Sequence, residues 1–130
     1  MAYSNKIIIV EDSKTIVKQI KLMLTHVNAT VLNVGGGFGL HKEIDSYGHT
    51  ADLILLDVNL KHESGLDILK ELREAEPYKN IPVIIITESR LKDNVIQAKK
   101  YKANSYLTKP FTKQMLLDKI ASCTGLDIHE

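Results

Sequence analysis

The stretch LILLD, residues 53–57, decides the fold, because an unbroken apolar run ends there in a single carboxylate. Three other runs end similarly: KIIIV at 6–10 meets Glu11-Asp12, VIII at 83–86 meets Thr87, and SYL at 105–107 meets Thr108-Lys109-Pro110. Short, non-alternating, β-branched runs are typical of strands buried on both faces of a parallel sheet. Ligands of open α/β sheets bind beyond the carboxyl ends of the strands. The sequence therefore predicts that these polar groups converge on one edge.

Helical patterns separate these runs. Apolar side chains recur at spacings of three and four within residues 16–27, and again after Ser64-Gly65. The expected strands cover about residues 6–10, 30–34, 53–56, 83–86 and 104–107, and the expected helices about 16–26, 40–46, 66–76, 92–101 and 112–122. Five strands alternating with five helices predict an α/β fold: a doubly wound, parallel (βα)5 sheet with right-handed crossovers and helices on both faces.

Several local details of these elements can be tested. Glycines at 35, 36, 37 and 39 indicate a flexible turn before a weak helix, and they match neither a dinucleotide-binding nor a phosphate-loop fingerprint. Glu76-Pro77 should stop the third helix. In the last helix, Met115, Leu116 and Ile120 should form the inner face. The five histidines lack metal-ligand spacing, so solvent-facing side chains are expected.

Composition bounds the class of protein. A chain of 130 residues with 44% hydrophobic and 25% charged residues predicts one domain over 1–130, with a core at about 6–122 and a loose tail or linker start at 125–130. A net charge of +1 gives no overall field for nucleic acid or an anionic membrane. Without a long apolar segment or a signal-peptide core, a cytoplasmic protein is expected. Cys123 is alone, so no disulfide framework is expected.

Each polar residue at the predicted edge has an ordinary explanation when it is taken alone. Asp12-Ser13 could simply cap a helix, and Lys109 could be a solvated surface cation. Tyr106 could be a half-buried sheet residue. These explanations do not predict all of these residue types in one order at the ends of four strands. The ordered set, rather than any single residue, indicates a functional site.

This ordered set resembles the receiver domain of two-component response regulators, over Lys6 to about Ser122. The resemblance rests on Glu11-Asp12, Asp57, Thr87 and Lys109-Pro110, each after its strand. It implies the flavodoxin-like strand order 2-1-3-4-5. It also implies that the Lys109-Pro110 peptide bond is cis, an isomer that the sequence itself does not reveal.

The resemblance implies a phosphorylation site. Asp57 would accept the phosphoryl group, which suits a carboxylate because no base has to remove a proton from it. Facing carboxylates repel one another unless a hard divalent cation lies among them, and Mg²⁺, with Mn²⁺ as a substitute, meets that demand. By resemblance, the metal ligands are Asp12, Asp57, the backbone carbonyl of Asn59, and Glu11 through water. By resemblance also, Lys109 and Thr87 contact the phosphoryl oxygens.

The resemblance further implies a switch. Thr87 would move toward the phosphate and Tyr106 would turn inward, changing the surface of the fourth helix, fifth strand and fifth helix. This surface is also where a homodimer would form. The partners would be a sensor histidine kinase or phosphotransfer protein, and a downstream effector or an output domain absent from the sequence. No enzyme acting on an external substrate is implied, and neither nucleic acid nor a membrane is an expected partner.

Two alternatives compete with this interpretation. A degenerate receiver would keep the fold as a constitutive protein-interaction module, and Glu88, where receivers usually have a small residue, is its best support. A Mg²⁺ phosphatase with an aspartyl intermediate is disfavoured, because Asn59 replaces the second aspartate that such enzymes carry. Lys61 is a further departure, since many receivers have proline there, and it predicts a differently shaped loop after Asp57.

Overall fold

The computed structural model describes residues 5–46, 51–74, 78–88 and 92–128. Five parallel strands form one sheet in the order β2-β1-β3-β4-β5, as expected. The strands are β1 (Lys6–Val10), β2 (Thr30–Val34), β3 (Leu53–Asp57), β4 (Val83–Thr87) and β5 (Ser105–Thr108). The helices are α1 (Lys14–Met23), α2 (Gly37–Ser46), α3 (Gly65–Leu72), α4 (Lys92–Lys100) and α5 (Lys113–Cys123). None of the helices in the described ranges combines the length and apolarity that crossing a bilayer requires.

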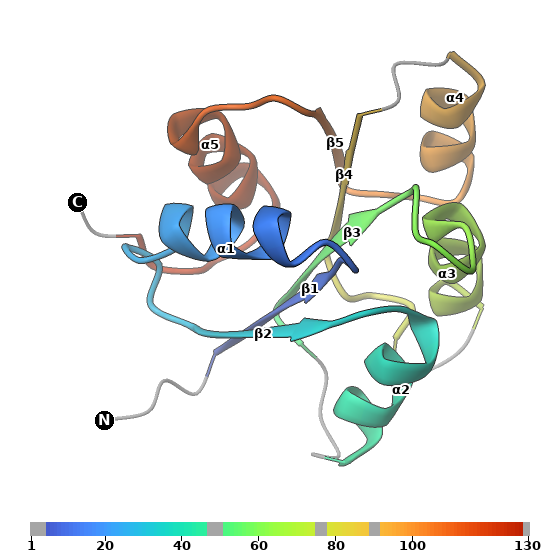
Figure 1. Cartoon of the computed structure of the whole chain (residues 1–130), viewed down its shortest axis with the longest axis horizontal. Helices are drawn as coiled ribbons and strands as arrows, with labels where there is room; N and C mark the ends of the chain where they lie inside the picture. Colours follow the sequence, from blue (N-terminus) through green and yellow to red (C-terminus); the bar gives the residue numbers. More distant parts are fainter. Residues whose placement is uncertain (1–4, 47–50, 75–77, 89–91, 129–130) are drawn as a thin grey trace.

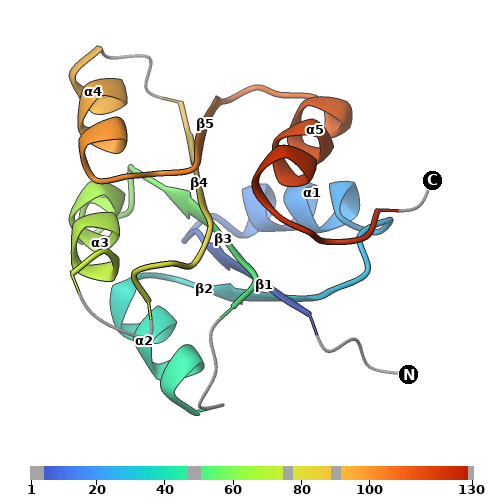
Figure 2. The same ribbon diagram turned by 180° about the vertical axis from the view of Figure 1, so that it is seen from behind.

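The sheet separates two apolar cores. Figures 1 and 2 show α1 and α5 covering one face while α2, α3 and α4 cover the other. Successive residues of a strand point to opposite faces, so in β1 Ile7 and Ile9 enter the α1–α5 core and Ile8 and Val10 enter the α2–α4 core. Strands β3 and β4 divide their residues in the same way. Burial on both faces explains why these strands are continuous apolar runs.

Several predicted boundaries are wrong. Helix α1 ends at Met23 rather than near His26, and Val27 instead pairs antiparallel with Ile128. The first tail residues are therefore folded and not loose: Leu126 is buried, and the Asn28 amide donates to the Asp127 carbonyl at 2.9 Å. Helix α3 ends at Leu72, before the predicted stop at Glu76-Pro77, which lies outside the described residues.

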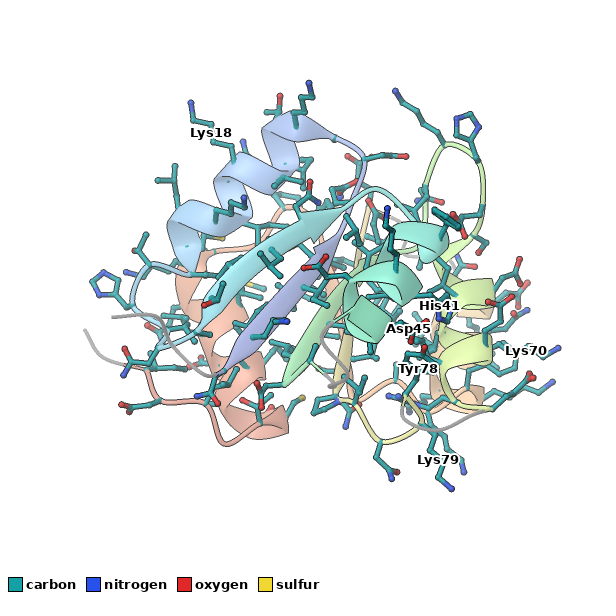
Figure 3. The ribbon with its side chains drawn as sticks, turned by 90° about the horizontal axis from the view of Figure 1, so that it is seen from below. Lys18, His41, Asp45, Lys70, Tyr78 and Lys79 are labelled. Atoms are coloured by element: carbon teal, nitrogen blue, oxygen red, sulfur yellow. The ribbon has the colours of Figure 1, made fainter. Side chains whose placement is uncertain are left out.

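One predicted inner face and two predicted histidine environments also need correction. In α5, Met115 is 45% exposed and Leu117 is buried in its place, beside Leu116 and Ile120. His26 and His41 are partly buried rather than solvent-facing, and the His41 ring meets the Tyr78 ring edge-on with centroids 5.0 Å apart. The Tyr78 hydroxyl donates to the Asp45 carboxylate, and Figure 3 shows these three side chains together between α2 and the chain after α3.

Gly65 is where α3 approaches β3 most closely. A Cβ atom there would lie 2.8 Å from the carbonyl carbon of Asp57 and 2.9 Å from the Cα of Val58. Both neighbours are backbone, so neither can move aside without displacing the chain beside Asp57. The Gly65 amide also donates to the Val58 carbonyl at 2.8 Å, which fixes the start of α3 against this chain.

We predict that Gly65→Ala lowers the free energy of unfolding by about 1–3 kcal/mol, because the methyl group overpacks the backbone after β3. Urea unfolding measures this. Gly35→Ala is the matched control, since a Cβ at Gly35 would meet nothing within 4 Å, and we expect a change of at most about 0.5 kcal/mol. Equal effects of the two substitutions would contradict the predicted close approach.

Candidate functional site

A lysine between two carboxylates forms the centre of the site. The Lys109 Nζ lies 2.9 Å from Glu11 Oε1 and 2.9 Å from Asp57 Oδ2. The three side chains are largely withdrawn from solvent, with exposures of 12% for Lys109, 4% for Glu11 and 7% for Asp57. Glu11 follows β1, Asp57 ends β3 and Lys109 follows β5. The parallel sheet therefore brings these sequence-predicted residues together at its carboxyl edge.

The backbone around Lys109 directs it toward the carboxylates. Its amide donates to the Thr87 carbonyl at 2.8 Å, which continues the pairing of β5 with β4 past the end of the strand. The Lys109-Pro110 peptide bond is cis, as the resemblance implied. The hydrogen bond to the end of β4 therefore fixes the backbone from which the Lys109 side chain extends.

Burial and charge shift the pKa values of this centre. The pKa of Glu11 is raised above 4.5, first by burial and then by the neighbouring Asp57 carboxylate, while Lys109 opposes the rise. For Lys109, burial lowers the pKa, but the hydrogen bonds to Glu11 and Asp57 outweigh burial and raise it overall. Lys109 is therefore held as a cation, and one ammonium faces two carboxylates.

The chain just after Asp57 links that residue to Thr87. The Asn59 amide donates to Asp57 Oδ1 at 2.9 Å, and the Asn59 side-chain Nδ2 donates to Thr87 Oγ1 at 3.1 Å. Thr87 itself is fully buried. Sequence reasoning considered only the Asn59 carbonyl and missed this side-chain contact. The available signal was the residue type at position 59, because asparagine has a side-chain N–H donor.

The acid pair is arranged by the start of α1. Glu11 Oε2 accepts from the amides of Asp12 at 3.0 Å and Ser13 at 3.4 Å. Ser13, not Asp12, is the N-cap, and its hydroxyl accepts from the Ile16 amide. The Asp12 side chain is left for another contact: its Oδ2 accepts from the backbone amide of Lys61 at 2.6 Å.

Most of these groups surround one cavity, but Thr87 is not among the residues that line it. Its volume is about 290 Å³, and its walls are formed by Glu11, Asp12, Ser13, Ile16, Asp57, Asn59, Glu88 and Lys109. A larger hollow of about 630 Å³ is lined by residues that include Asn5, Asp52 and Cys123, and it shares no lining residue with the first cavity. Among its described lining residues, only Asp52 has a charged side chain. Glu88 is exposed. Tyr106 does not line the cavity; it is partly buried and packs against the α2–α4 core.

The donor set suits Mg²⁺ better than a metal held in a closed cage. Within the described ranges, no group of three or more His, Cys, Asp and Glu side chains is already spaced to hold a metal. Mg²⁺ usually keeps several waters and takes only one or two carboxylates together with phosphate oxygens. Asp12 Oδ1 has no hydrogen-bond donor among the described residues, although Asp12 lines the cavity. Asp12 and Asp57 therefore fit such an ion.

The turn that the sequence indicated is confined to Gly35 and Gly36, which bend the chain between β2 and α2. Helix α2 begins at Gly37, and the Gly37 amide donates to the Glu63 carboxylate at 3.1 Å. A Cβ on Gly36 would collide with the same carboxylate. Gly36 and Gly37 thus allow the Glu63 side chain, from the loop after Asp57, to approach closely. The negative charge of Glu63 faces the start of a helix, where it is favourable.

Comparison with known proteins identifies the family. Residues 7–121 match the response regulator receiver domain family. The chain belongs to this family. Chemotaxis protein CheY1 of Helicobacter pylori is 36% identical over 121 residues, which cover 92% of this chain and 97% of that protein. Response regulator ArlR of Staphylococcus saprophyticus is 36% identical over 88% of this chain and 50% of that longer protein.

Solved receiver structures have the same fold. A response regulator receiver domain protein from Clostridium thermocellum superposes with a TM-score of 0.79 at 32% identity, covering 90% of this chain and 91% of that one. The phosphorylated cyanobacterial phytochrome response regulator RcpA superposes with a TM-score of 0.77 at 28% identity, covering 90% and 88%. The predicted resemblance and the predicted strand order are both confirmed.

We predict that Lys109→Met lowers the free energy of unfolding by about 3 kcal/mol near neutral pH, because Glu11 and Asp57 are left uncompensated. The loss should shrink on acidification. Glu11 has a folded-state pKa above 4.5, so its protonation favours the folded state; that stabilisation is complete below pH 4.5 and is lost as the pH rises through the raised pKa.

Urea unfolding of wild type and Lys109→Met at several pH values between about 4 and 8 measures this effect. Lys113→Met is the matched control, because Lys113 is exposed at the start of α5. A loss of stability that does not depend on pH would show that Lys109 acts through packing rather than through its charge.

Proposed function

We propose that this receiver domain is a Mg²⁺-dependent phosphoacceptor in the cytoplasm, and that Asp57 takes its phosphoryl group from the phosphohistidine of a sensor histidine kinase or phosphotransfer protein. The observation that supports this most directly is the contact of Asp57 Oδ2 with Lys109 Nζ at 2.9 Å, in a cavity that Asp12 also lines. A nucleophile, a cation for the phosphoryl oxygens and a metal-ligating carboxylate are then within one small space.

The transfer step balances without a general base. The carboxylate of Asp57 attacks phosphorus in line, and a P–O bond forms as the P–N bond of the donor breaks. The donor ring, protonated on its other nitrogen, leaves with the electron pair as neutral imidazole. Lys109 follows the phosphoryl oxygens as a compact cation. The product is an acyl phosphate, and the domain turns over no external substrate: it would act only on its own phosphorylation and dephosphorylation.

The excess of negative charge in the cavity supports a metal requirement. Among the described residues, four carboxylates, those of Glu11, Asp12, Asp57 and Glu88, line the cavity with one ammonium, that of Lys109. An incoming phosphoryl group adds further negative charge. When bound, Mg²⁺ or Mn²⁺ would supply positive charge against the phosphoryl oxygens and the attacking carboxylate. Asp12, Asp57 and the Asn59 carbonyl would hold it directly, and Glu11 would act through water.

The proposed switch starts at the Asn59–Thr87 hydrogen bond. A phosphoryl oxygen offers the Thr87 hydroxyl a stronger, charged acceptor, so Thr87 would turn toward the phosphate and away from its present arrangement with Asn59. Movement at the end of β4 would then allow Tyr106, whose register partner is Ile85 on β4, to change its packing. The altered surface would comprise α4, β5 and α5, where an effector or a second copy would bind.

The decisive experiment is intact mass after incubation with acetyl phosphate. We expect one phosphoryl adduct on wild type in the presence of Mg²⁺, and none after chelation. Asp57→Asn should carry no adduct, because an amide is not a nucleophile of comparable strength. Asp67→Asn, an exposed carboxylate on α3, is the matched control and should be modified like wild type. An adduct that survives in Asp57→Asn would overturn the assignment.

The rival function, a constitutive interaction module, rests on Glu88. This carboxylate is exposed and lines the cavity, so it adds negative charge where an anionic donor enters. We predict that Glu88→Ala raises the initial rate of modification by acetyl phosphate roughly two- to fivefold at low ionic strength, and that salt removes the difference.

The matched control for Glu88→Ala is Glu74→Ala, which removes an exposed carboxylate just after α3. It should leave the rate and its salt dependence unchanged. If wild type is not modified but Glu88→Ala is, Glu88 closes the site and the rival function is favoured. Equal rates for Glu88→Ala and wild type at low salt would show that Glu88 does not control entry.

A further inference from the structure

The backbone amide of Lys61 holds the Asp12 carboxylate. It donates to Asp12 Oδ2 at 2.6 Å, between residues that are 49 positions apart in the sequence. Asp12 is partly buried, whereas Lys61 is exposed. The contact therefore joins the loop between β3 and α3 to the segment before α1, and Asp12 itself lines the cavity together with Asp57.

This bond occupies one oxygen of Asp12 and leaves the other available. A carboxylate has about four lone-pair sites on its two oxygens, so a donor on Oδ2 does not prevent Oδ1 from binding a cation. Glu11 and Asp57 differ in this respect, because both of their oxygens already accept donors: amides and Lys109 for Glu11, and Asn59 and Lys109 for Asp57. Among these three carboxylates, Asp12 Oδ1 alone has no donor from the described residues.

We propose that the main-chain amide of Lys61 is a positioning group that orients Asp12 so that Oδ1 is presented to a divalent cation. The inference rests on the proposed Mg²⁺-dependent function and adds a residue to its site. Loss of a hydrogen bond that orients a metal-ligating side chain typically costs roughly 10- to 100-fold in metal affinity or activity. Lys61 would act through Asp12 and would not itself touch the metal or the phosphoryl group.

The loop holds this amide in place without the Lys61 side chain. Upstream, the Asn59 amide is bound to Asp57, and Asn59 forms a bridge with Ser64. Downstream, Glu63 accepts from the Gly37 amide at 3.1 Å. The position of the amide is therefore set by contacts on either side of it. Any residue at 61 that has an N–H can make the bond, and proline is the residue that cannot.

The first test compares Lys61→Pro with Lys61→Ala. Both remove the ammonium, but only proline removes the N–H, so the ratio of their Mg²⁺ dissociation constants isolates the amide from the side-chain charge. Titration of each metal-free protein with MgCl₂ by calorimetry gives that ratio. We expect Lys61→Pro to bind Mg²⁺ about tenfold more weakly than Lys61→Ala. Equal affinities, or tighter binding by Lys61→Pro, would overturn the inference.

A second variant guards against a change of loop shape by the proline ring. Replacing residue 61 by the α-hydroxy analogue of lysine converts the amide to an ester, which removes the N–H and keeps the side chain. The ester should weaken Mg²⁺ binding by a factor similar to that of proline. Wild-type affinity in a folded ester variant would show that the effect of proline comes from the ring, and would count against the inference.

A third measurement does not use the metal. In a cycle of wild type, Asp12→Ala, Lys61→Pro and the double variant, thermal unfolding of the metal-free proteins reports the coupling between the amide and the carboxylate. Lys61→Pro should lower Tm less in the Asp12→Ala background than in wild type. Equal shifts in both backgrounds would mean that the amide and Asp12 do not interact, and would overturn the inference.

These outcomes separate the inference from the proposed function. If wild type binds Mg²⁺ and forms the Asp57 adduct while the cycle shows no coupling, only the role of Lys61 fails. If the amide controls Mg²⁺ affinity but Asp57 is not phosphorylated, only the phosphoacceptor function fails. If wild type does not bind Mg²⁺, both fail, because a positioning role for a metal ligand then has no metal to serve.

Discussion

The site depends on one charge interaction, the ammonium of Lys109 between Glu11 and Asp57. Without this ammonium, the two largely buried carboxylates would repel each other strongly. Burial alone already raises the pKa of Glu11. The contact spans 98 positions of sequence between Glu11 and Lys109, so only the folded sheet creates it. In the proposed function the same ammonium would also contact the phosphoryl group, so Lys109 would then no longer compensate Glu11 and Asp57 alone.

The sheet provides the precision that this arrangement needs. Parallel pairing places Asp57 opposite Ile86 and Thr87 opposite Thr108, so the ends of β3, β4 and β5 are staggered in a fixed register. Gly65 then brings α3 directly against the backbone after Asp57. Rigid strands with cores on both faces can position charged groups that would be poorly held on flexible loops. The energetic cost of gathering carboxylates is thus met by packing elsewhere in the domain.

The strands and the charged residues of the site could be predicted from sequence, whereas the contacts that orient them could not. The apolar runs that end in Asp57 and Thr87 strongly indicate strands, because burial on both faces of the sheet restricts such strands to a few apolar residue types. The Lys61 amide carries only the signal that residue 61 is not proline, since every other residue has the same donor and only loop geometry selects its acceptor. Met115 and Leu117 show a related limit: both are apolar and only two positions apart, and the final rotation of α5 decides which is buried. The contact of Gly36 and Gly37 with Glu63 could not be predicted either, because Glu63 is distant in sequence.

The loop after β3 connects these separately oriented groups. Asn59, Lys61 and Glu63 alternate along it, and each contacts a different element: Thr87 at the end of β4, Asp12 before α1, and Gly37 at the start of α2. The loop also carries the Asn59 amide that binds Asp57 Oδ1. A change of charge on Asp57 would act on that amide. Because the three contacts belong to one short segment, the resulting movement of the loop would not be confined to Thr87. Asp12, the proposed metal ligand, and the start of α2 would experience the same displacement, so metal binding and the response at Thr87 should be coupled through this segment.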